Sequence, residues 1–239
     1  MQQQQQEAAA AENKVTFEAV PENKKGKVPG YLFGAAGKQR GLVVIQEWWG
    51  VNAQIKGLAA RLASDLDCLA LVPDLYRGEV ATDHEHAGHL MSGLDWAGAI
   101  SDIRGAVQYL LSQGCTKVAV TGTCMGGALA LAASILVEEL TAAVVFYGIC
   151  SPELADPTKV RVPIQCHFGL KDSLAGFSDP AAQDALEAKL KEGEANYEFY
   201  RYEGADHAFL NEARPEVYNE EAAKLALCRM KDFVEKHLA

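Results

Sequence analysis

A cysteine stands at the centre of Gly122-Thr123-Cys124-Met125-Gly126, between an apolar run and a helical stretch of small residues. A nucleophile flanked at two positions by glycine is typical of a nucleophile elbow, the sharp turn that joins a strand to a helix. The two glycines remove Cβ atoms that such a turn would crowd. A helix N-terminus also favours the thiolate form of a cysteine. We therefore predict that Cys124 is a catalytic nucleophile rather than an incidental buried cysteine.

A base and an acid follow in the order that a catalytic triad requires. His207 lies in GADHAF, just after the last predicted strand, whereas the other five histidines lie within an apolar run, at the C-terminal end or in one cluster. Asp172 follows the preceding strand and would orient the imidazole. Asp206 is a poor candidate because adjacent side chains in a turn point apart, and Asp179 fits a helix cap better. The sequence thus predicts a triad of Cys124, His207 and Asp172.

A glutamate beside two tryptophans ends the first buried strand, in the segment QEWWG at 46–50. A carboxylate there is costly unless it is paired or protonated. We predict that Glu47 reaches the thiol and controls its protonation; the alternative is a surface glutamate that caps the next helix. The same loop should supply the backbone N–H of Trp48 to an oxyanion hole, opposite the N–H of Met125.

Substrate contacts are predicted from the loops that surround these residues. Arg77, in PDLYRG at 73–78, could bind a substrate carboxylate through two parallel hydrogen bonds. Its alternative is a solvated or salt-bridged arginine. The further residues that we assign to substrate binding are Trp48, Tyr76, Tyr147, Phe209 and Asn211.

Three histidines cluster at His84, His86 and His89. Their spacing differs from the H-E-x-x-H zinc motif, and a spacing of two and three residues in a loop is weak evidence for a metal. We therefore predict no metal site here and interpret the segment as a polar lid loop.

The elements that must position these residues alternate between strand and helix. The apolar runs are near-continuous, as in strands covered on both faces, so the class is α/β with a mostly parallel central sheet and helices on both faces. A run of alternating polarity at 197–202 suggests a strand nearer an edge, and segments 15–20 and 31–33 could form an antiparallel hairpin at one edge. The buried strands are expected at 41–46, 68–72, 117–121, 142–147 and 164–168, and the helices at about 52–65, 96–113, 127–138, 180–192 and 215–237.

Composition limits the possible functions. The chain has 239 residues, 49% of them hydrophobic, and a net charge of -10, which argues against a nucleic-acid partner. No run reaches the roughly 18 apolar residues of a membrane span, and the start has no secretory signal, so a cytoplasmic protein is expected. Residues 1–14 form a low-complexity tail that we expect to be disordered, followed by a single domain at 15–239. The six scattered cysteines include no CxxC pair, so no disulfide framework is expected.

The segments IQEWWGVN, PDLYRG, TGTCMGGALAL and GADHAF appear in an order that resembles the dienelactone hydrolase (carboxymethylenebutenolidase) family of α/β-hydrolases. The resemblance spans roughly residues 15–238. It implies the α/β-hydrolase fold and a monomeric enzyme with no cofactor and no membrane partner. It also implies that Glu47 keeps the thiol neutral at rest and deprotonates it when substrate displaces the carboxylate. One departure concerns the substrate: Asn211 stands where family members carry an arginine, and Arg77 matches a second arginine only with a one-residue shift.

The expected reaction is therefore hydrolysis of a lactone or small activated ester through an acyl-thioester on Cys124. A broader carboxylesterase or thioesterase is the first alternative. A second alternative is a redox-sensing or binding protein that keeps the fold, because a reactive thiol at a helix N-terminus also suits a peroxide sensor.

Overall fold

The computed structural model describes residues 13–239, which contribute eight strands to one sheet in the order β1-β2-β4-β3-β5-β6-β7-β8. Strands β3 to β8 run parallel, and β1 and β2 are antiparallel to their neighbours at one edge. The arrangement is the α/β-hydrolase fold. The strands are β1 (Asn13–Phe17), β2 (Val28–Phe33), β3 (Arg40–Ile45), β4 (Leu69–Pro73), β5 (Lys117–Thr123), β6 (Ala142–Phe146), β7 (Ile164–Gly169) and β8 (Tyr197–Tyr202).

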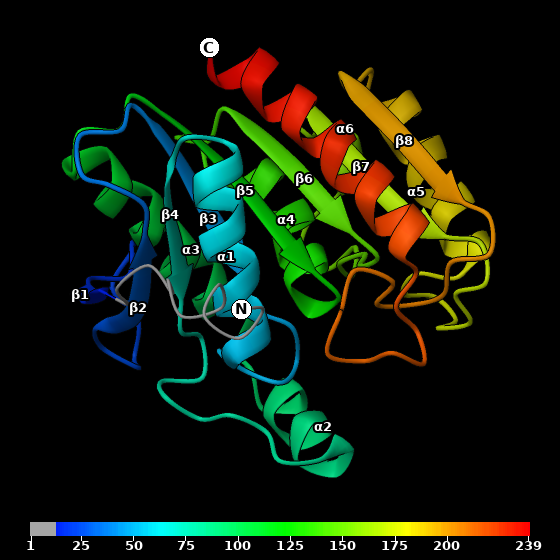
Figure 1. The fold of residues 1–239 in the computed structure, drawn as a ribbon, viewed down its shortest axis with the longest axis horizontal. Helices are drawn as coiled ribbons and strands as arrows, with labels where there is room; N and C mark the ends of the chain where they lie inside the picture. Colours follow the sequence, from blue (N-terminus) through cyan, green and yellow to red (C-terminus); the bar gives the residue numbers. More distant parts are fainter. Residues whose placement is uncertain (1–12) are drawn as a thin grey trace, which may run out of the picture.

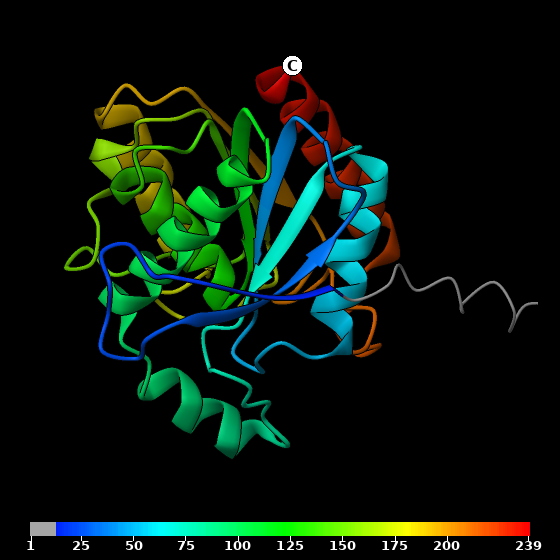
Figure 2. The same ribbon diagram turned by 90° about the vertical axis from the view of Figure 1, so that its left-hand side faces the viewer.

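Helices cover both faces of this sheet. In Figure 1, α1 and α6 lie in front of the strands, and α3, α4 and α5 lie behind them. Helix α2 lies apart, beyond the carboxyl ends of the strands, and Figure 2 shows it projecting from the body of the molecule. The helices are α1 (Ala53–Asp65), α2 (His84–Ser92), α3 (Trp96–Ser112), α4 (Met125–Leu136), α5 (Pro180–Glu192) and α6 (Glu220–Leu238).

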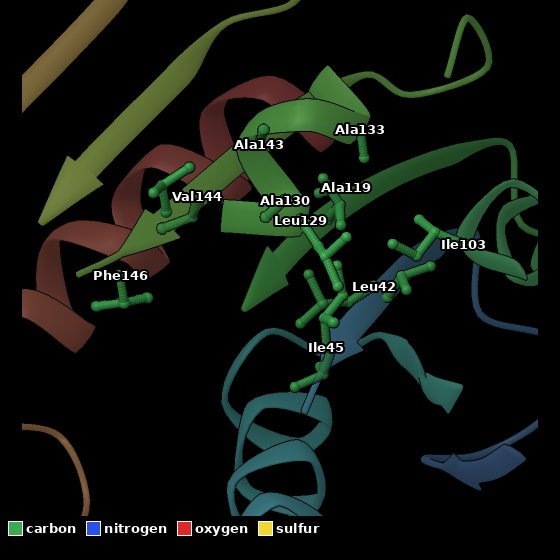
Figure 3. Packing of buried hydrophobic residues seen from close by; sticks show 14 of the residues in the cluster. Leu42, Ile45, Ile103, Ala119, Leu129, Ala130, Ala133, Ala143, Val144 and Phe146 are labelled. Carbon is green, nitrogen blue, oxygen red and sulfur yellow. The ribbon is translucent and has the colours of Figure 1, made fainter. Parts of the chain in front are cut away.

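The core explains why the strands are so uniformly apolar. Strands β4, β6 and β7 are buried along their whole length, because helices cover both of their faces. Helix α4 is buried on nearly all sides, and its glycines and alanines let it pack close to β5 and β6. Figure 3 shows Leu129 of α4 pointing toward Leu42 of β3 and Ile103 of α3. The loops after β3, β5, β7 and β8 are thereby held at one edge of the sheet, where ligands of open α/β sheets bind.

The predicted architecture is confirmed, with three differences in detail. Segment 84–92, expected to be a loop, is a helix because Asp83 caps it: the Asp83 carboxylate accepts a hydrogen bond from the backbone N–H of His86 at 2.8 Å. Helix α6 begins at Glu220 rather than near 215, because Asn219 is its N-cap. Asn13 and Lys14, assigned above to the tail, belong to β1; the rest of the predicted tail lies outside the described residues.

Two further expectations can be compared with the structure. The six cysteines are free thiols, five buried and Cys228 exposed. Among residues 13–239, no helix is long and apolar enough to span a membrane.

Candidate active site

The turn between β5 and α4 has the geometry of a nucleophile elbow. Cys124 adopts φ 56° and ψ −120°, a strained backbone conformation for a residue with a side chain, and α4 starts at the next residue. A Cβ on Gly122 would lie 2.2 Å from the carbonyl oxygen of Gly126, and a Cβ on Gly126 would lie 2.4 Å from the carbonyl oxygen of Ile45. Only glycine fits at these two positions, which is the reason given above for expecting a sharp turn here.

The predicted base and acid meet beside this turn. Nδ1 of His207 lies 2.8 Å from Oδ2 of Asp172, and the backbone N–H of Leu174 donates to Oδ1 of Asp172 at 3.0 Å. Asp172 is 2% exposed, so this buried carboxylate is held by the imidazole and the loop together. Asp206 instead accepts a hydrogen bond from the backbone N–H of His207 at 2.6 Å. Asp206 thus binds the backbone of His207, whereas Asp172 binds its ring.

The other nitrogen of the imidazole has no partner. Nε2 of His207 is buried and forms no hydrogen bond within residues 13–239. With Nδ1 engaged by Asp172, the ring is oriented so that Nε2 is the nitrogen left for proton transfer. The ring packs edge-on against Tyr147, with 5.1 Å between ring centroids.

Glu47 is buried in the same site, at 4% exposure. Nδ2 of Asn211 donates to its Oε2 at 3.0 Å, whereas Oε1 is buried without a hydrogen-bond partner in the described chain. Burial raises the pKa of this carboxyl, against the opposing effects of His207, Thr123 and Asn211. Glu47 is therefore an acid whose proton affinity exceeds that of an ordinary glutamate.

The Cys124 thiol is 8% exposed, and burial raises its pKa above the ordinary value. The charge of Glu47 raises the pKa further, while the backbone N–H groups of Met125 and Trp48 lower it. These are the two N–H groups predicted to form the oxyanion hole, and both lie close enough to the sulfur to act on it. The arrangement favours a neutral thiol in the ligand-free protein.

Arg77 has a different environment from the one predicted. Its guanidinium forms two hydrogen bonds to the carboxylate of Asp102 in α3, at 2.7 and 2.9 Å, and one to the backbone carbonyl of Asp74 at 3.1 Å. The Asp102 side chain is only 3% exposed. A buried carboxylate therefore occupies the face of Arg77 that would bind a substrate carboxylate, which favours the salt-bridged alternative considered above.

The remaining predicted substrate residues differ in accessibility. Trp48 is half-buried, and Tyr76, 7% exposed, donates its hydroxyl toward Sδ of Met125 at 3.2 Å. Tyr147 and Phe209 are fully buried, with 5.2 Å between their ring centroids, so both lie behind the site and pack its wall. Asn211, predicted to bind substrate, instead holds Glu47.

Helix α2 takes the place of the predicted lid loop. The ring of His84 packs edge-on against Trp48 and Trp49, at centroid distances of 5.8 and 5.0 Å. Nδ1 of His86 instead accepts a hydrogen bond from the backbone N–H of Thr82 at 3.4 Å. The three histidines thus have separate surroundings on a short helix that abuts the loop of Glu47.

The sequence analysis missed three residues that contribute to the site. The hydroxyl of Ser178 lies 3.1 Å from Nδ1 of His207, so it shares this nitrogen with Asp172. Asp102, within α3, pairs with Arg77, and Thr123 lies close enough to Glu47 to lower the pKa of its carboxyl. An aspartate that falls on the buried face of a predicted helix, as Asp102 does, could have been recognised as an ion-pair partner. Ser178 and Thr123 could not, because their contacts depend on how two loops meet.

The sequence pattern of the dienelactone hydrolase family matches residues 28–238 of this chain. The chain belongs to the dienelactone hydrolase family. It is 31% identical over 211 residues to the protein usf of Aquifex pyrophilus, covering 81% of this chain and 86% of that one. It is 30% identical to the carboxymethylenebutenolidase of Pseudomonas putida over 225 residues, or 87% and 92% of the two chains.

A solved structure gives the same result. A Klebsiella pneumoniae protein described as a candidate dienelactone hydrolase superposes with a TM-score of 0.78 at 26% identity, covering 93% of this chain and 98% of that one. Membership in the dienelactone hydrolase family places the protein among hydrolases of lactones or esters, as the resemblance implied.

Proposed function

We propose that this dienelactone hydrolase family member opens a lactone or activated ester with Cys124 as nucleophile and forms an acyl-thioester intermediate. The observation that carries the proposal is the convergence on one strained turn of a thiol, an oriented imidazole with a free buried Nε2, and two backbone N–H groups. This is the set of groups that acyl transfer requires: nucleophile, base and anion stabiliser.

In the proposed first half-reaction, the substrate enters and the thiol proton passes to Glu47, whose burial gives it a raised pKa and an unpaired oxygen. The Cys124 thiolate attacks the carbonyl carbon, and the oxyanion receives hydrogen bonds from the N–H groups of Met125 and Trp48. The carbon–oxygen bond to the leaving group then breaks and leaves an enolate or alkoxide and a thioester. A thiolate nucleophile suits an activated leaving group of this kind.

In the second half-reaction, Nε2 of His207 takes a proton from water, and the resulting hydroxide attacks the thioester carbonyl. The carbon–sulfur bond breaks and releases the acid and the Cys124 thiolate. The imidazolium gives its proton to the leaving group, and Glu47 returns its proton to sulfur. One water is consumed, and all groups of the protein return to their starting protonation.

The raised pKa of Cys124 favours this proposal over redox sensing. Thiols that react with peroxide are exposed and have a low pKa, whereas Cys124 is buried and burial raises its pKa. A carboxylesterase or thioesterase of broader range would use the same groups and differs only in its acyl group.

The test is hydrolysis of p-nitrophenyl acetate by the wild-type protein and two matched variants. Cys124→Ala should abolish turnover, while Cys228→Ala, the same change at the exposed cysteine, should leave it intact. In His207→Ala, deacylation should stall, so intact-mass spectrometry should show one added acetyl group that maps to Cys124. Full turnover by Cys124→Ala would refute the proposal.

A further inference from the structure

A large apolar cleft adjoins the candidate active site. Its volume is about 1070 Å³, and its walls come from α2, the start of α3, the loop after β6 and the exposed face of α5. The half-buried side chains that line it include Met91, Trp96, Ile149, Leu154 and Phe177. A cleft of this size and lining binds hydrocarbon rather than a small, highly polar acid.

Two structural features connect the cleft to the reacting groups. The ring of Phe177 lines the cleft, lies 6.2 Å from the ring of His207, and is followed in the chain by Ser178, which contacts Nδ1 of that histidine. Ile149, another lining residue, follows Gly148 in the chain. A Cβ on that glycine would lie 2.0 Å from the carbonyl oxygen of Cys124, so the residue before Ile149 packs directly against the backbone of the nucleophile.

The charges around the cleft do not suit a substrate carboxylate. Its lining includes Glu153 and Asp156, and its lysine, Lys189, pairs with Glu192 at 3.1 Å. The excess of carboxylates would repel an anionic group of the substrate.

The groups placed to hold a carboxylate at the site itself are already engaged. Arg77 is paired with buried Asp102, and Asn211 donates to Glu47. Arg214, three residues beyond Asn211, pairs with Glu216 at 2.8 Å. Breaking the Arg77 pair to bind substrate would leave the buried Asp102 carboxylate without its cationic partner and with only the amide of Asn23 donating to it, which costs more than an exposed contact returns.

We infer that the substrate is an uncharged ester or lactone with an extended apolar group, and that this cleft binds that group during attack by Cys124. The inference rests on the proposed function for the catalytic step and adds the substrate class. Each methylene that the cleft removes from water strengthens transition-state binding by about fourfold, provided that the group stays in the cleft as the thioester forms.

Two substrate series test the inference. Linear p-nitrophenyl esters from acetate to octanoate lengthen the acyl group, and S-alkyl thioacetates from ethyl to octyl lengthen the leaving group. In at least one series, kcat/KM should rise on the order of a hundredfold with length. p-Nitrophenyl hydrogen suberate, an octanoate analogue that ends in a carboxylate, should be turned over at least about tenfold more slowly than the octanoate.

Variants on α5 fill the cleft without touching the reacting groups. Ala182→Phe and Ala185→Phe place rings in the lining, whereas Ala188→Phe makes the same change at an exposed alanine outside it. The first two should lower kcat/KM for the preferred long substrate by about tenfold or more and leave p-nitrophenyl acetate within about threefold. Retained acetate turnover also shows that the variants are folded. Ala188→Phe should match the wild type on every substrate.

A binding measurement separates failure of this inference from failure of the proposed function. Calorimetric titration with decan-2-one, which cannot be hydrolysed, should show binding to the wild type and Ala188→Phe, weakened about tenfold or more in Ala182→Phe. If no ester is turned over but this pattern holds, the proposed function is wrong and the cleft assignment stands. Flat length dependence, a preference for the suberate, or equal decan-2-one affinity in all three proteins would each overturn the inference.

Discussion

Two groups of buried polar side chains lie in the same sheet and differ in how their atoms are paired. In the His167 cluster, formed by His167, Gln165 and Tyr202 of β7 and β8, Nδ1 of the histidine lies 2.8 Å from the Tyr202 hydroxyl and Nε2 lies 2.8 Å from Oε1 of Gln165. Gln165 in turn donates to Glu198 at 2.7 Å. Both nitrogens of this fully buried imidazole are therefore paired.

At the carboxyl ends of the strands the pairing is incomplete. Nε2 of His207, Oε1 of Glu47 and the hydroxyl of Tyr147 are buried with no hydrogen-bond partner in the described part of the chain. A buried polar atom without a partner destabilises the fold by about 1–3 kcal/mol. The comparison teaches that the His167 cluster contributes to stability, whereas the polar atoms around Cys124 are left unpaired at a cost in stability. In the proposed mechanism, two of them, Nε2 of His207 and a carboxylate oxygen of Glu47, accept protons.

The largest expected effect comes from making one substitution in both places. His207→Gln should lower kcat/KM on the order of a thousandfold, because the base is lost. His167→Gln should leave kcat/KM within about threefold and lower the free energy of unfolding by about 1–3 kcal/mol, because it breaks two buried hydrogen bonds. Ester assays and urea unfolding measure the two quantities. If both variants lost activity and were equally stable, the distinction between the His167 cluster and the site around Cys124 would be wrong.

The Arg77–Asp102 pair sharpens the comparison, since it lies near the site and is joined by two charge-assisted hydrogen bonds. Arg77→Ala should lower the free energy of unfolding by about 3–5 kcal/mol, because the Asp102 carboxylate is left buried without its cation and keeps only the hydrogen bond from the amide of Asn23. Among molecules that remain folded, KM should change equally for octanoate and suberate esters. A selective rise in KM for the suberate would instead show that Arg77 binds the carboxylate of a substrate.

The pH dependence of stability tests the His167 cluster by itself. Burial, with a smaller contribution from Arg229, lowers the pKa of His167 to about 3 from its ordinary value of 6.5. Between these pH values the unfolded chain binds a proton that the folded protein does not. The neutral form of His167 therefore makes its full contribution to the free energy of unfolding above pH 6.5. As pH falls from 6.5 toward 3, this contribution decreases by about 1.4 kcal/mol per pH unit. His167→Gln should remove this slope from urea-unfolding curves; an unchanged slope would show that other groups produce it.

The sequence was sufficient for the fold because the signals are local. Near-continuous apolar runs predicted the buried strands, and the alternating run at 197–202 predicted the edge strand β8. Segment 84–92 was predicted to be a polar lid loop, and this prediction was wrong because the segment forms helix α2. Its capping residue Asp83 and the Glu85 of its first turn are ordinary helix-start signals.

For the site, the sequence predicted which residues belong to it but not which hydrogen-bond or ion-pair partners they have. Cys124, His207 and Asp172 follow from spacing and strand order, and the structure brings His207 and Asp172 into contact. Arg77 and Asn211 were predicted to face substrate because their types suit it. Their engagement by Asp102 and Glu47 depends on contacts between segments 25 and 164 residues apart, which spacing along the chain does not specify.

The central claim is that the buried site keeps Cys124 as a neutral thiol until substrate arrives, with Glu47 as the controlling carboxylate. The most direct test is an ultraviolet titration of thiolate absorbance in the ligand-free protein, taken as the difference between wild type and Cys124→Ala. Because burial and the charge of Glu47 both raise the pKa of Cys124, the wild type should show no Cys124 thiolate at neutral pH, and Glu47→Gln should titrate at lower pH. Substantial Cys124 thiolate in the wild type at neutral pH, with the same midpoint in Glu47→Gln, would contradict the account.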